Sequence, residues 1–497
     1  MNQLTSPRFD NSYVLLPDRF YSHQIPTPVK APALIRVNRL LAEQLGLSVE
    51  WLESAEGLEV LAGNQVAPGS VPIATAYAGH QFGGWNPRLG DGRAVLLGEL
   101  VATDGQRYDM QLKGAGRTPY ARGGDGRSPL GPVLREYVVS EAMAALGVPT
   151  SRSLAAVTTG EPVVRDLLQP GGILTRVSRS HIRIGTFQYF AGQNDTEAVR
   201  TLADHVIARH YPEATDNPRP YVALLQGVIA RQAQLIAQWQ QLGFIHGVMN
   251  TDNMLVSGET IDYGPCAFMD SYHPNTVYSS IDANGRYAYV NQPAIAQWNL
   301  AWLARALLPI MDKDEDAAVQ AAQQAIDDFV PQYEAAYSDI MQRKLGFCRS
   351  DAGGKALVDE LLELMAAAKA DYTLTFRRLA EHAGAGIGHG NGDSVTALFE
   401  LPDSFAPWVE KWEARLAAET LTAEERQRQM LALNPAFIPR NHLVEEVIRA
   451  AVDNNDLEPF HQLVDRLGEP CRYDAADTRY AMPPKPEQVV LRTFCGT

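Results

Sequence analysis

The segment FIHGVMNTDNMLVSGETIDYGPCAF, residues 244–268, carries the polar pattern that decides how this chain is interpreted. Asn253 follows His246 by seven positions, and Asp262-Tyr263-Gly264 begins nine positions later. Asn and Asp oxygens, with waters and phosphates, are the ligands that Mg²⁺ prefers. Asp252 stands beside Asn253 and is a candidate general base. The alternative is an Asx-type turn, in which these side chains bond only their own backbone.

The spacing resembles the catalytic loop of protein kinases, which has the pattern H-R-D-L-x-x-x-N followed by D-F-G. The catalytic aspartate of that pattern would stand two positions after His246, where this chain has Val248. Asn253 and Asp262 match the metal-binding positions. The sequence therefore predicts that metal and nucleotide binding are kept while the base is displaced to Asp252.

The charge balance limits the classes of partner. There are 43 Lys and Arg against 58 Asp and Glu, a net charge of -15, whereas a binder of nucleic acid or anionic membrane needs a basic surface. No apolar run is long enough to span a membrane, and no secretory signal is visible. Four scattered cysteines give neither a disulfide framework nor a zinc site. We expect a cytoplasmic protein without nucleic-acid or membrane partners.

The order of predicted elements favours an α+β chain. Apolar runs predict strands at 94–101 and 108–113 and a helix at about 129–146, and ALIRVNRLLAEQLGL (33–47) is predicted as one helix. Long helices are predicted at about 222–242 and 294–308, and residues 310–465 are expected to be largely helical, interrupted by GAGIGHGNGD near 384.

This order predicts a protein-kinase-like two-lobe fold with a strand-rich N-lobe, a helical C-lobe and a helical C-terminal extension. The expected domains are a strand-rich nucleotide-binding lobe with an N-terminal extension, a helical lobe with the catalytic and metal-binding loop, and a helical C-terminal region with the tail, at residues 1–195, 196–310 and 311–497.

Glycines and cations before and after the predicted strands indicate phosphate binding. Gly90 and Gly92 flank Asp91 before a strand, where backbone N–H groups can approach a phosphate, and Arg93 adds a cation. A simple turn is the alternative. Lys113 ends the second strand, the position of the kinase phosphate lysine, which pairs with a helix glutamate. Glu136 is the expected partner, and Glu141 competes with it.

Two segments add further arginines. GAGRTPYARGGDGRSP (114–129) combines glycines with three arginines, and ILTRVSRSHIRIGTF (173–187) contains Arg176, Arg179 and Arg183. On one strand Arg176 and Arg183 would face opposite sides, so both reach one ligand only if the chain bends between them. Arginines in an apolar stretch need partners. A polyphosphate is one such partner, and acidic surface residues are the other.

Several long motifs in order resemble the selenoprotein O family. They are YAGHQFGGWNPRLGDGRA, QLKGAGRTPYAR, SHIRIGTF, GVMNTDNM, IDYGP and NQPAIAQWNL; the match runs from about residue 70 to 308, and the final CGT is similar to that family's ending. The resemblance implies a kinase-like fold that binds ATP in a flipped orientation. It also implies transfer of AMP to Ser, Thr or Tyr hydroxyls of proteins, the enzyme itself being one potential substrate, with Mg²⁺ or Mn²⁺ as cofactor.

The resemblance also implies a site. Nucleotide contacts are expected from Gly90, Gly92, Arg93, Lys113, Asp125 and Gly126, with Arg176 and Arg183 on the distal phosphates and Glu136 as the partner of Lys113. Asn253 and Asp262 would bind the metal, and Asp262 would thereby also contact the nucleotide. Asp252 would accept the proton. Cys495 replaces the selenocysteine of some relatives, and we hypothesise that it pairs with Cys266.

Two alternatives stay open. A phosphotransferase acting on proteins or small molecules is disfavoured because Val248 leaves no carboxylate at the usual base position. A nucleotide-binding pseudokinase scaffold would not need both Asn253 and Asp262. The sequence does not identify the substrates, the preferred nucleotide or the oligomeric state.

Overall fold

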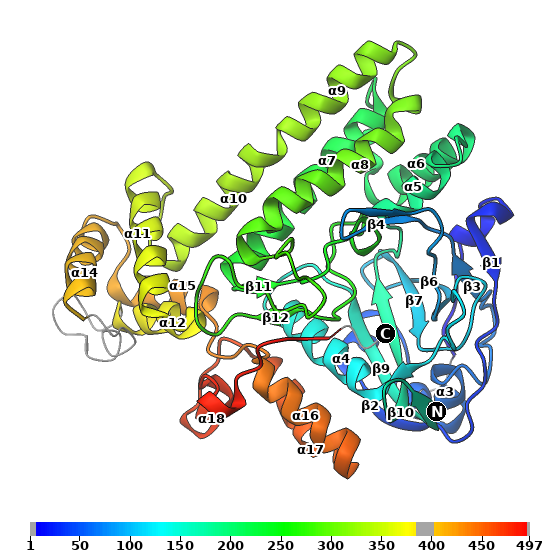
Figure 1. Cartoon of the computed structure of the whole chain (residues 1–497), viewed down its shortest axis with the longest axis horizontal. Coiled ribbons are helices and arrows are strands. Elements are labelled where there is room, and N and C mark those ends of the chain that lie inside the picture. Colours follow the sequence, from blue (N-terminus) through cyan, green and yellow to red (C-terminus); the bar gives the residue numbers. More distant parts are fainter. Residues whose placement is uncertain (1–5, 384–401, 495–497) are drawn as a thin grey trace.

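The computed structural model describes residues 6–383 and 402–494. An antiparallel eight-stranded sheet occupies the first part of the chain, in the order β1-β3-β6-β7-β10-β9-β2, with β8 paired to β10 (Figure 1). The strands are β1 Tyr21–His23, β2 Ala33–Val37, β3 Ile73–Thr75, β6 Ala94–Val101, β7 Arg107–Lys113, β8 Ser128–Pro129, β9 Arg152–Val164 and β10 Leu168–Ser178. The hairpins β4 Gly79–Gln81 with β5 Gly84–Asn86, and β11 Phe244–Ile245 with β12 Ala267–Phe268, are separate.

The predicted strands at 94–101 and 108–113 are confirmed as β6 and β7. Lys113 pairs with Ala94 of β6 and with Leu174 of β10, which places it between two neighbouring strands. The register also puts Arg176 opposite Gln111. Because side chains two residues apart share a face, Lys113 and Arg176 lie on the same face of the sheet.

The prediction of a single helix over 33–47 is wrong in its first part. Residues 33–37 form β2, which pairs with β9, and the buried side chains of Ile35 and Val37 alternate along it. The helix α1, Arg39–Gln44, begins after Asn38, whose side chain accepts the Leu41 N–H. β-Branched residues at every second position favour the strand once a neighbouring strand is present.

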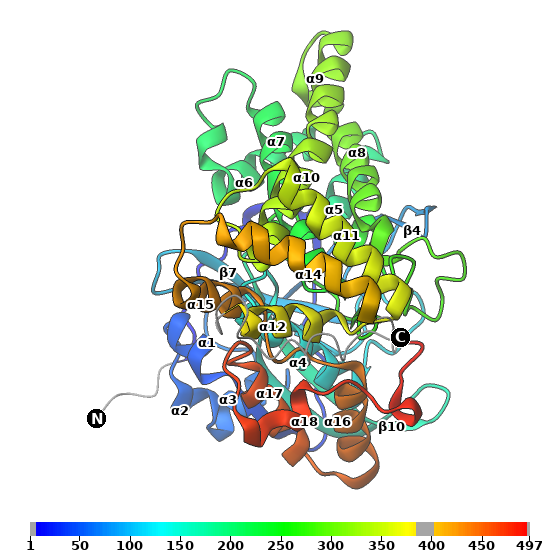
Figure 2. The ribbon, with the colours of Figure 1, turned by 90° about the vertical axis from the view of Figure 1, so that its left-hand side faces the viewer.

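Helix α4, Leu130–Ala145, confirms the helix predicted at about 129–146 and packs against β9 and β10. Leu130, Val133, Leu134 and Val138 belong to an apolar cluster with Ala156 and Leu174 of the two strands. Helices α16, Asn441–Asn454, and α17, Glu458–Leu467, pack on α4 as well (Figure 2). The helix that carries Glu136 is therefore packed against both the sheet and the C-terminal helices.

The part of the chain after the sheet is helical, as predicted. Helices α7, Pro220–Gln241, and α8, Gln292–Met311, confirm the helices expected at about 222–242 and 294–308. Helix α7 packs against both α8 and α10, Phe329–Lys344 (Figure 1). Other α-helices before α10 are α2 Val49–Leu52, α3 Ala55–Leu61, α5 Ile184–Ala191, α6 Thr196–His210 and α9 Glu315–Asp327.

The largely helical character predicted for residues 310–465 is confirmed, and the interruption GAGIGHGNGD falls outside the described residues. Arg440, fully buried, pairs with Asp270 and Asp371 and ties the C-terminal helices to the segment after β12. No helix within 6–383 and 402–494 has the length and hydrophobicity to cross a membrane. The last helices are α11 Ala352–Ala368, α12 Tyr372–His382, α14 Pro402–Ala417, α15 Ala423–Leu433 and α18 Thr478–Ala481.

Candidate active site

Five charged side chains from separate segments meet beside the sheet. We call them the buried charge cluster: Lys113 at the end of β7, Glu136 on α4, Arg176 on β10, Arg183 just before α5, and Asp262 in the loop after β11. The carboxylate of Glu136 accepts hydrogen bonds from Lys113 Nζ through Oε2 and from Arg176 Nε through Oε1. The predicted pairing of Lys113 with Glu136 is therefore present. Glu141 instead contacts Arg152.

Asp262 joins the two arginines. Its Oδ1 accepts from Arg176 at 2.6 Å and its Oδ2 accepts from Arg183 at 2.6 Å, while Lys113 Nζ lies 3.8 Å from Oδ1. The backbone of Asp262 has a φ of 62°, in the left-handed region that non-glycine residues rarely adopt. Such conformations concentrate at functional sites, and this one directs the carboxylate toward the arginines.

The chain bends between the two arginines, as their shared ligand requires. Strand β10 ends at Ser178, and Arg183 precedes α5, so both guanidinium groups reach Asp262. Arg183 also donates to the backbone carbonyl of Asp252 and lies 4.7 Å from the centre of the Tyr77 ring. Arg179 points away from Asp262, because its guanidinium donates a hydrogen bond to the side chain of Gln106.

The charges do not balance within the cluster. Three cations face two carboxylates, which leaves one positive charge within these five side chains, whose exposed fractions are 8% or less, except for Asp262 at 23%. The carboxylates of Asp91 and Asp252, outside the cluster, also act on Arg183. Burial opposes ionisation of Asp262, but Arg176, Arg183 and Lys113 hold its pKa well below the usual range. Burial and the nearby Arg176 lower the pKa of Lys113. A bound anion would balance the remaining charge.

Asp252 lies in the 3₁₀ turn Thr251–Asn253 and is 6% exposed. Gln81 Nε2 donates to Oδ2 at 3.0 Å, and Oδ1 has no hydrogen-bond partner among the described residues. A Cβ at Gly79 would lie 2.4 Å from Oδ1, so only glycine permits this approach. Burial raises the pKa of Asp252 to about 6. A carboxylate with a free, buried oxygen and a raised pKa has the properties of a general base.

Asn253 is oriented by the backbone next to it. Its Nδ2 donates to the Val248 carbonyl at 2.9 Å, which leaves Oδ1 as the atom able to bind a cation. The carboxylate of Asp262 is the second candidate oxygen ligand. Among residues 6–383 and 402–494 no three His, Cys, Asp or Glu side chains form a metal-binding group. A Mg²⁺ site made of one carboxylate, one amide, waters and phosphates needs no such group, so the residues fit the ion.

The glycine turn lies beside the cluster. Gly90 has a φ of 81°, and a Cβ there would meet the Tyr120 ring at 2.4 Å. The N–H groups of Asp91 and Gly92 are bonded to Thr75 and Gly90 carbonyls, so their backbone is already partly satisfied. Arg93 is next to the strand position that pairs with Lys113, and its charge acts on the Lys113 ammonium.

Asp125 and Gly126 are placed differently from one another. The Gly126 carbonyl accepts the Gly116 N–H at 3.0 Å, close to the end of β7. The Asp125 carboxylate pairs with Arg165 at 2.9 Å and is 45% exposed. The structure thus brings Gly126 near the strand that carries Lys113 and leaves Asp125 in an exposed ion pair.

The motifs alone do not reveal the residues that hold Asp252. Gly79 and Gln81 belong to YAGHQFGGW, a segment rich in glycine and aromatics in which no residue has an obvious chemical role. The hypothesised thiol pair stays a hypothesis, because Cys495 lies outside the described residues. Thr493 Oγ1, two positions before it, donates to the carbonyl of Pro265, which adjoins Cys266.

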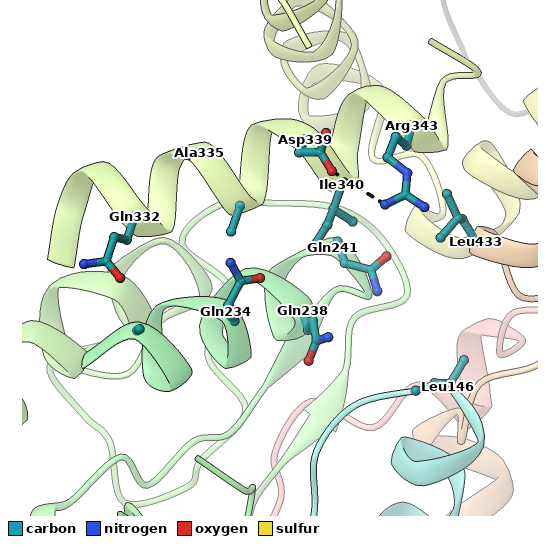
Figure 3. Close-up of a pocket in the computed structure, with 13 residues that line it drawn as sticks. Leu146, Gln234, Gln238, Gln241, Gln332, Ala335, Asp339, Ile340, Arg343 and Leu433 are labelled. Carbon is teal, nitrogen blue, oxygen red and sulfur yellow. Dashed lines mark ion pairs between the residues drawn. The ribbon is translucent and has the colours of Figure 1, made fainter. Parts of the chain in front are cut away.

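A separate pocket of about 710 Å³, lined by both polar and apolar side chains, lies between α7 and α10. Figure 3 shows Gln234, Gln238 and Gln332 on its walls and the ion pair of Asp339 with Arg343 at one end. None of the predicted site residues lines this pocket.

Comparison with known proteins adds independent findings. The profile of the family described as "Protein adenylyltransferase SelO" matches residues 3–468. The chain is 58% identical over 489 residues to "Protein nucleotidyltransferase YdiU" of Rhodopseudomonas palustris (strain BisB5), which covers 98% of this chain and 99% of the relative. It is 59% identical over 491 residues to the protein with the same description from Bradyrhizobium sp. (strain ORS 278), with the same coverage.

Proposed function

The chain belongs to the SelO family of protein adenylyltransferases, and on that premise we propose that it transfers AMP from ATP to Ser, Thr or Tyr hydroxyls of protein substrates, with itself as one potential acceptor. The observation that carries the proposal is the buried charge cluster, whose three cations exceed its two carboxylates beside a carboxylate suited to act as a base. A polyphosphate supplies the missing negative charge.

The proposed architecture is that of a two-lobe kinase-like fold. The antiparallel sheet with α4 would be the nucleotide-binding lobe (1–195), followed by the helical lobe with the 251–253 turn (196–310) and the C-terminal helical region (311–497). The Lys113–Glu136 pair and the loop with Asp262 support this assignment, because both are parts of the kinase machinery.

In the proposed reaction Asp252 accepts the proton of the acceptor hydroxyl. The hydroxyl oxygen then forms a bond to the α-phosphorus, and the bond from that phosphorus to the oxygen bridging to the β-phosphate breaks. Pyrophosphate leaves with the electron pair. Because the free Oδ1 of Asp252 is buried and Gln81 fixes Oδ2, the base is oriented before the acceptor arrives.

The arginines explain why the nucleotide would bind in a flipped orientation. Pyrophosphate is the leaving group in AMP transfer but not in the reaction of a kinase, and its negative charge increases as it leaves. Fixed cations stabilise that charge without reorganisation. Arg176 and Arg183 are the side chains proposed to contact the distal phosphates, and the remaining nucleotide contacts are Gly90, Gly92, Arg93, Lys113, Asp125 and Gly126. Asp262, which here accepts hydrogen bonds from Arg176 and Arg183, would then be released toward the metal.

Mg²⁺ or Mn²⁺ would be held by Asn253 and Asp262, and when bound it supplies charge neutralisation at the phosphates. Both ligands are oxygen atoms in a hydrogen-bonded loop: Asn253 donates to the Val248 carbonyl, and Nε2 of His246 donates to the Ile261 carbonyl at 2.8 Å. These hydrogen bonds hold the backbone segments that carry the two ligands.

The variant Asp252→Ala tests the assignment of the base. We expect ATP to raise its melting temperature as much as for the wild type, while AMP transfer falls roughly 100-fold or more, the usual contribution of a positioned base. Asp359→Ala, which removes an exposed carboxylate paired with Lys355, is the matched control and should leave both unchanged. An unchanged transfer rate in Asp252→Ala would exclude Asp252 as the base.

A further inference from the structure

The β4–β5 hairpin sets a group of aromatic rings beside Asp252. Gln81 of this hairpin donates to the Asp252 carboxylate, and the N–H of His80 donates to Thr251. The His80 ring stacks on Trp302 of α8 with centroids 3.9 Å apart and lies 4.9 Å from Trp85. The hairpin therefore connects the proposed base directly to the surface formed by these rings.

Two arginines lie over the same rings. The Arg286 guanidinium is 4.7 Å from the Trp298 ring centre, and that of Arg305 is 5.1 Å from the Trp302 ring centre. Within the described part of the chain neither forms an ion pair, and Arg286 Nε is buried without a hydrogen-bond partner. The carboxylate nearest in sequence, Asp282, accepts backbone N–H groups of residues 286 and 287.

We call Trp85, Trp298, Trp302, Arg286 and Arg305 the tryptophan–arginine patch. Trp85 is 45% exposed and Arg305 is exposed, whereas the other three residues are half-buried, so the patch is open to solvent at Trp85 and Arg305. Its two positive charges stand out in a chain with a net charge of -15. A guanidinium that lies over an aromatic ring can still donate from its N–H groups to a carboxylate.

We propose that the tryptophan–arginine patch binds acidic residues of a protein substrate that flank the acceptor hydroxyl. This proposal rests on the proposed function, because it places the acceptor segment within reach of Asp252. Carboxylates of the substrate pair with Arg286 and Arg305, and its backbone or an apolar side chain packs on Trp85. The hydroxyl between the acidic residues then lies beside the hairpin residue Gln81, which bonds the Asp252 carboxylate.

A single-stranded nucleic acid also uses aromatic rings and cations. The observations favour a peptide for two reasons. A long polyanion is repelled by a chain whose net charge is -15, whereas a short acidic segment needs only the two cations of the patch. In addition, the hairpin that carries Trp85 also carries Gln81, which bonds the carboxylate of Asp252, the proposed base for a single hydroxyl.

The test uses two synthetic peptides of equal length with one central threonine, flanked on both sides by glutamates or by glutamines. We expect kcat/KM for AMP transfer to be roughly five- to tenfold higher for the glutamate peptide, as two exposed ion pairs allow. The preference should shrink at high salt, which screens exposed charges. The double variant Arg286→Gln/Arg305→Gln should lose the preference and retain its rate with the glutamine peptide.

Arg349→Gln is the matched control, since it removes an exposed arginine from the α10–α11 connection, and it should keep the preference. The stabilisation of each variant by ATP shows that it is folded. Equal kcat/KM of the wild type for both peptides would overturn the proposal. So would an RNA oligonucleotide that inhibits the wild type and spares the double variant while the peptides remain equivalent.

Direct binding separates this proposal from the proposed function. Fluorescence anisotropy of a labelled glutamate peptide needs no turnover, so it tests the patch even where AMP transfer fails. Binding that is weakened roughly five- to tenfold in the double variant supports the patch. The absence of transfer to every peptide and to the proteins of a cell lysate would count against the adenylyltransferase assignment alone.

Discussion

Replacing Glu136 by glutamine should separate the nucleotide site from the rest of the fold. Glu136 is 1% exposed, and its two oxygens accept hydrogen bonds from Lys113 and Arg176. A glutamine of the same shape keeps one acceptor oxygen, and its NH₂ group then faces one of the two cations. The net charge of the buried charge cluster rises from +1 to +2.

Removing one partner of a buried ion pair costs about 3–5 kcal/mol. Arg176 repels Lys113, so without the Glu136 charge the free energy that favours the present position of Lys113 falls by this amount. If AMP transfer requires Lys113 there, about 3 kcal/mol corresponds to a rate lower by roughly 100-fold. The melting temperature without ATP should fall as well.

Transfer of α-labelled ATP to acceptor protein, together with thermal melting, measures both effects. Glu141→Gln is the control on the same helix, because Glu141 pairs with Arg152 and accepts the Ser153 N–H away from Lys113. It should lower stability and leave transfer within a few-fold of wild type. A folded Glu136→Gln protein with transfer within twofold of wild type would refute the reasoning.

Three other sites lead to predictions of their own. Asp262→Asn should raise the Mg²⁺ concentration for half-maximal transfer, and chelation by EDTA should abolish wild-type transfer; transfer that withstands EDTA would contradict the metal assignment. Gly79→Ala places a Cβ 2.4 Å from Asp252 Oδ1, so transfer should fall at least tenfold with unchanged ATP affinity, whereas Gly353→Ala should be neutral; a normal rate would contradict the packing argument. Burial lowers the pKa of Lys344 to about 7, whereas its pKa in the unfolded chain is about 10. The melting temperature should therefore rise when the pH is raised above 7, and Lys344→Met should abolish this rise. An equal change in melting temperature between pH 7 and 9 for the two proteins would contradict the argument.

Local patterns were sufficient for the regular elements of the sheet and its helix. The strands β6 and β7 and helix α4 follow from apolar runs bounded by glycine and proline. The strand β2 did not, because its five residues become a strand only beside β9, which lies more than a hundred positions away. Tertiary pairing here overrides a sequence that also suits a helix.

The site shows the same limit. Lys113 and Glu136 could be paired from a strand end and a helix position, and their contact is present. The meeting of Arg176 and Arg183 on Asp262 required a bend that no sequence pattern indicated. Gln81 and Asp252 are 171 positions apart, and glutamine has no local signature of such a role. Long-range hydrogen bonds of this kind are visible only once the fold has brought the two segments together.

The identity of the phosphate that reaches the acceptor tests the proposed reaction most directly. Purified protein is incubated with Mg²⁺, a cell lysate as acceptor, and ATP labelled at either the α- or the γ-phosphate, and the label on the denatured proteins is counted. We predict label from the α position alone, with Asp252→Ala as the blank. Label from the γ position alone would make the chain a phosphotransferase and contradict both the role of Asp252 as base and the significance of Val248.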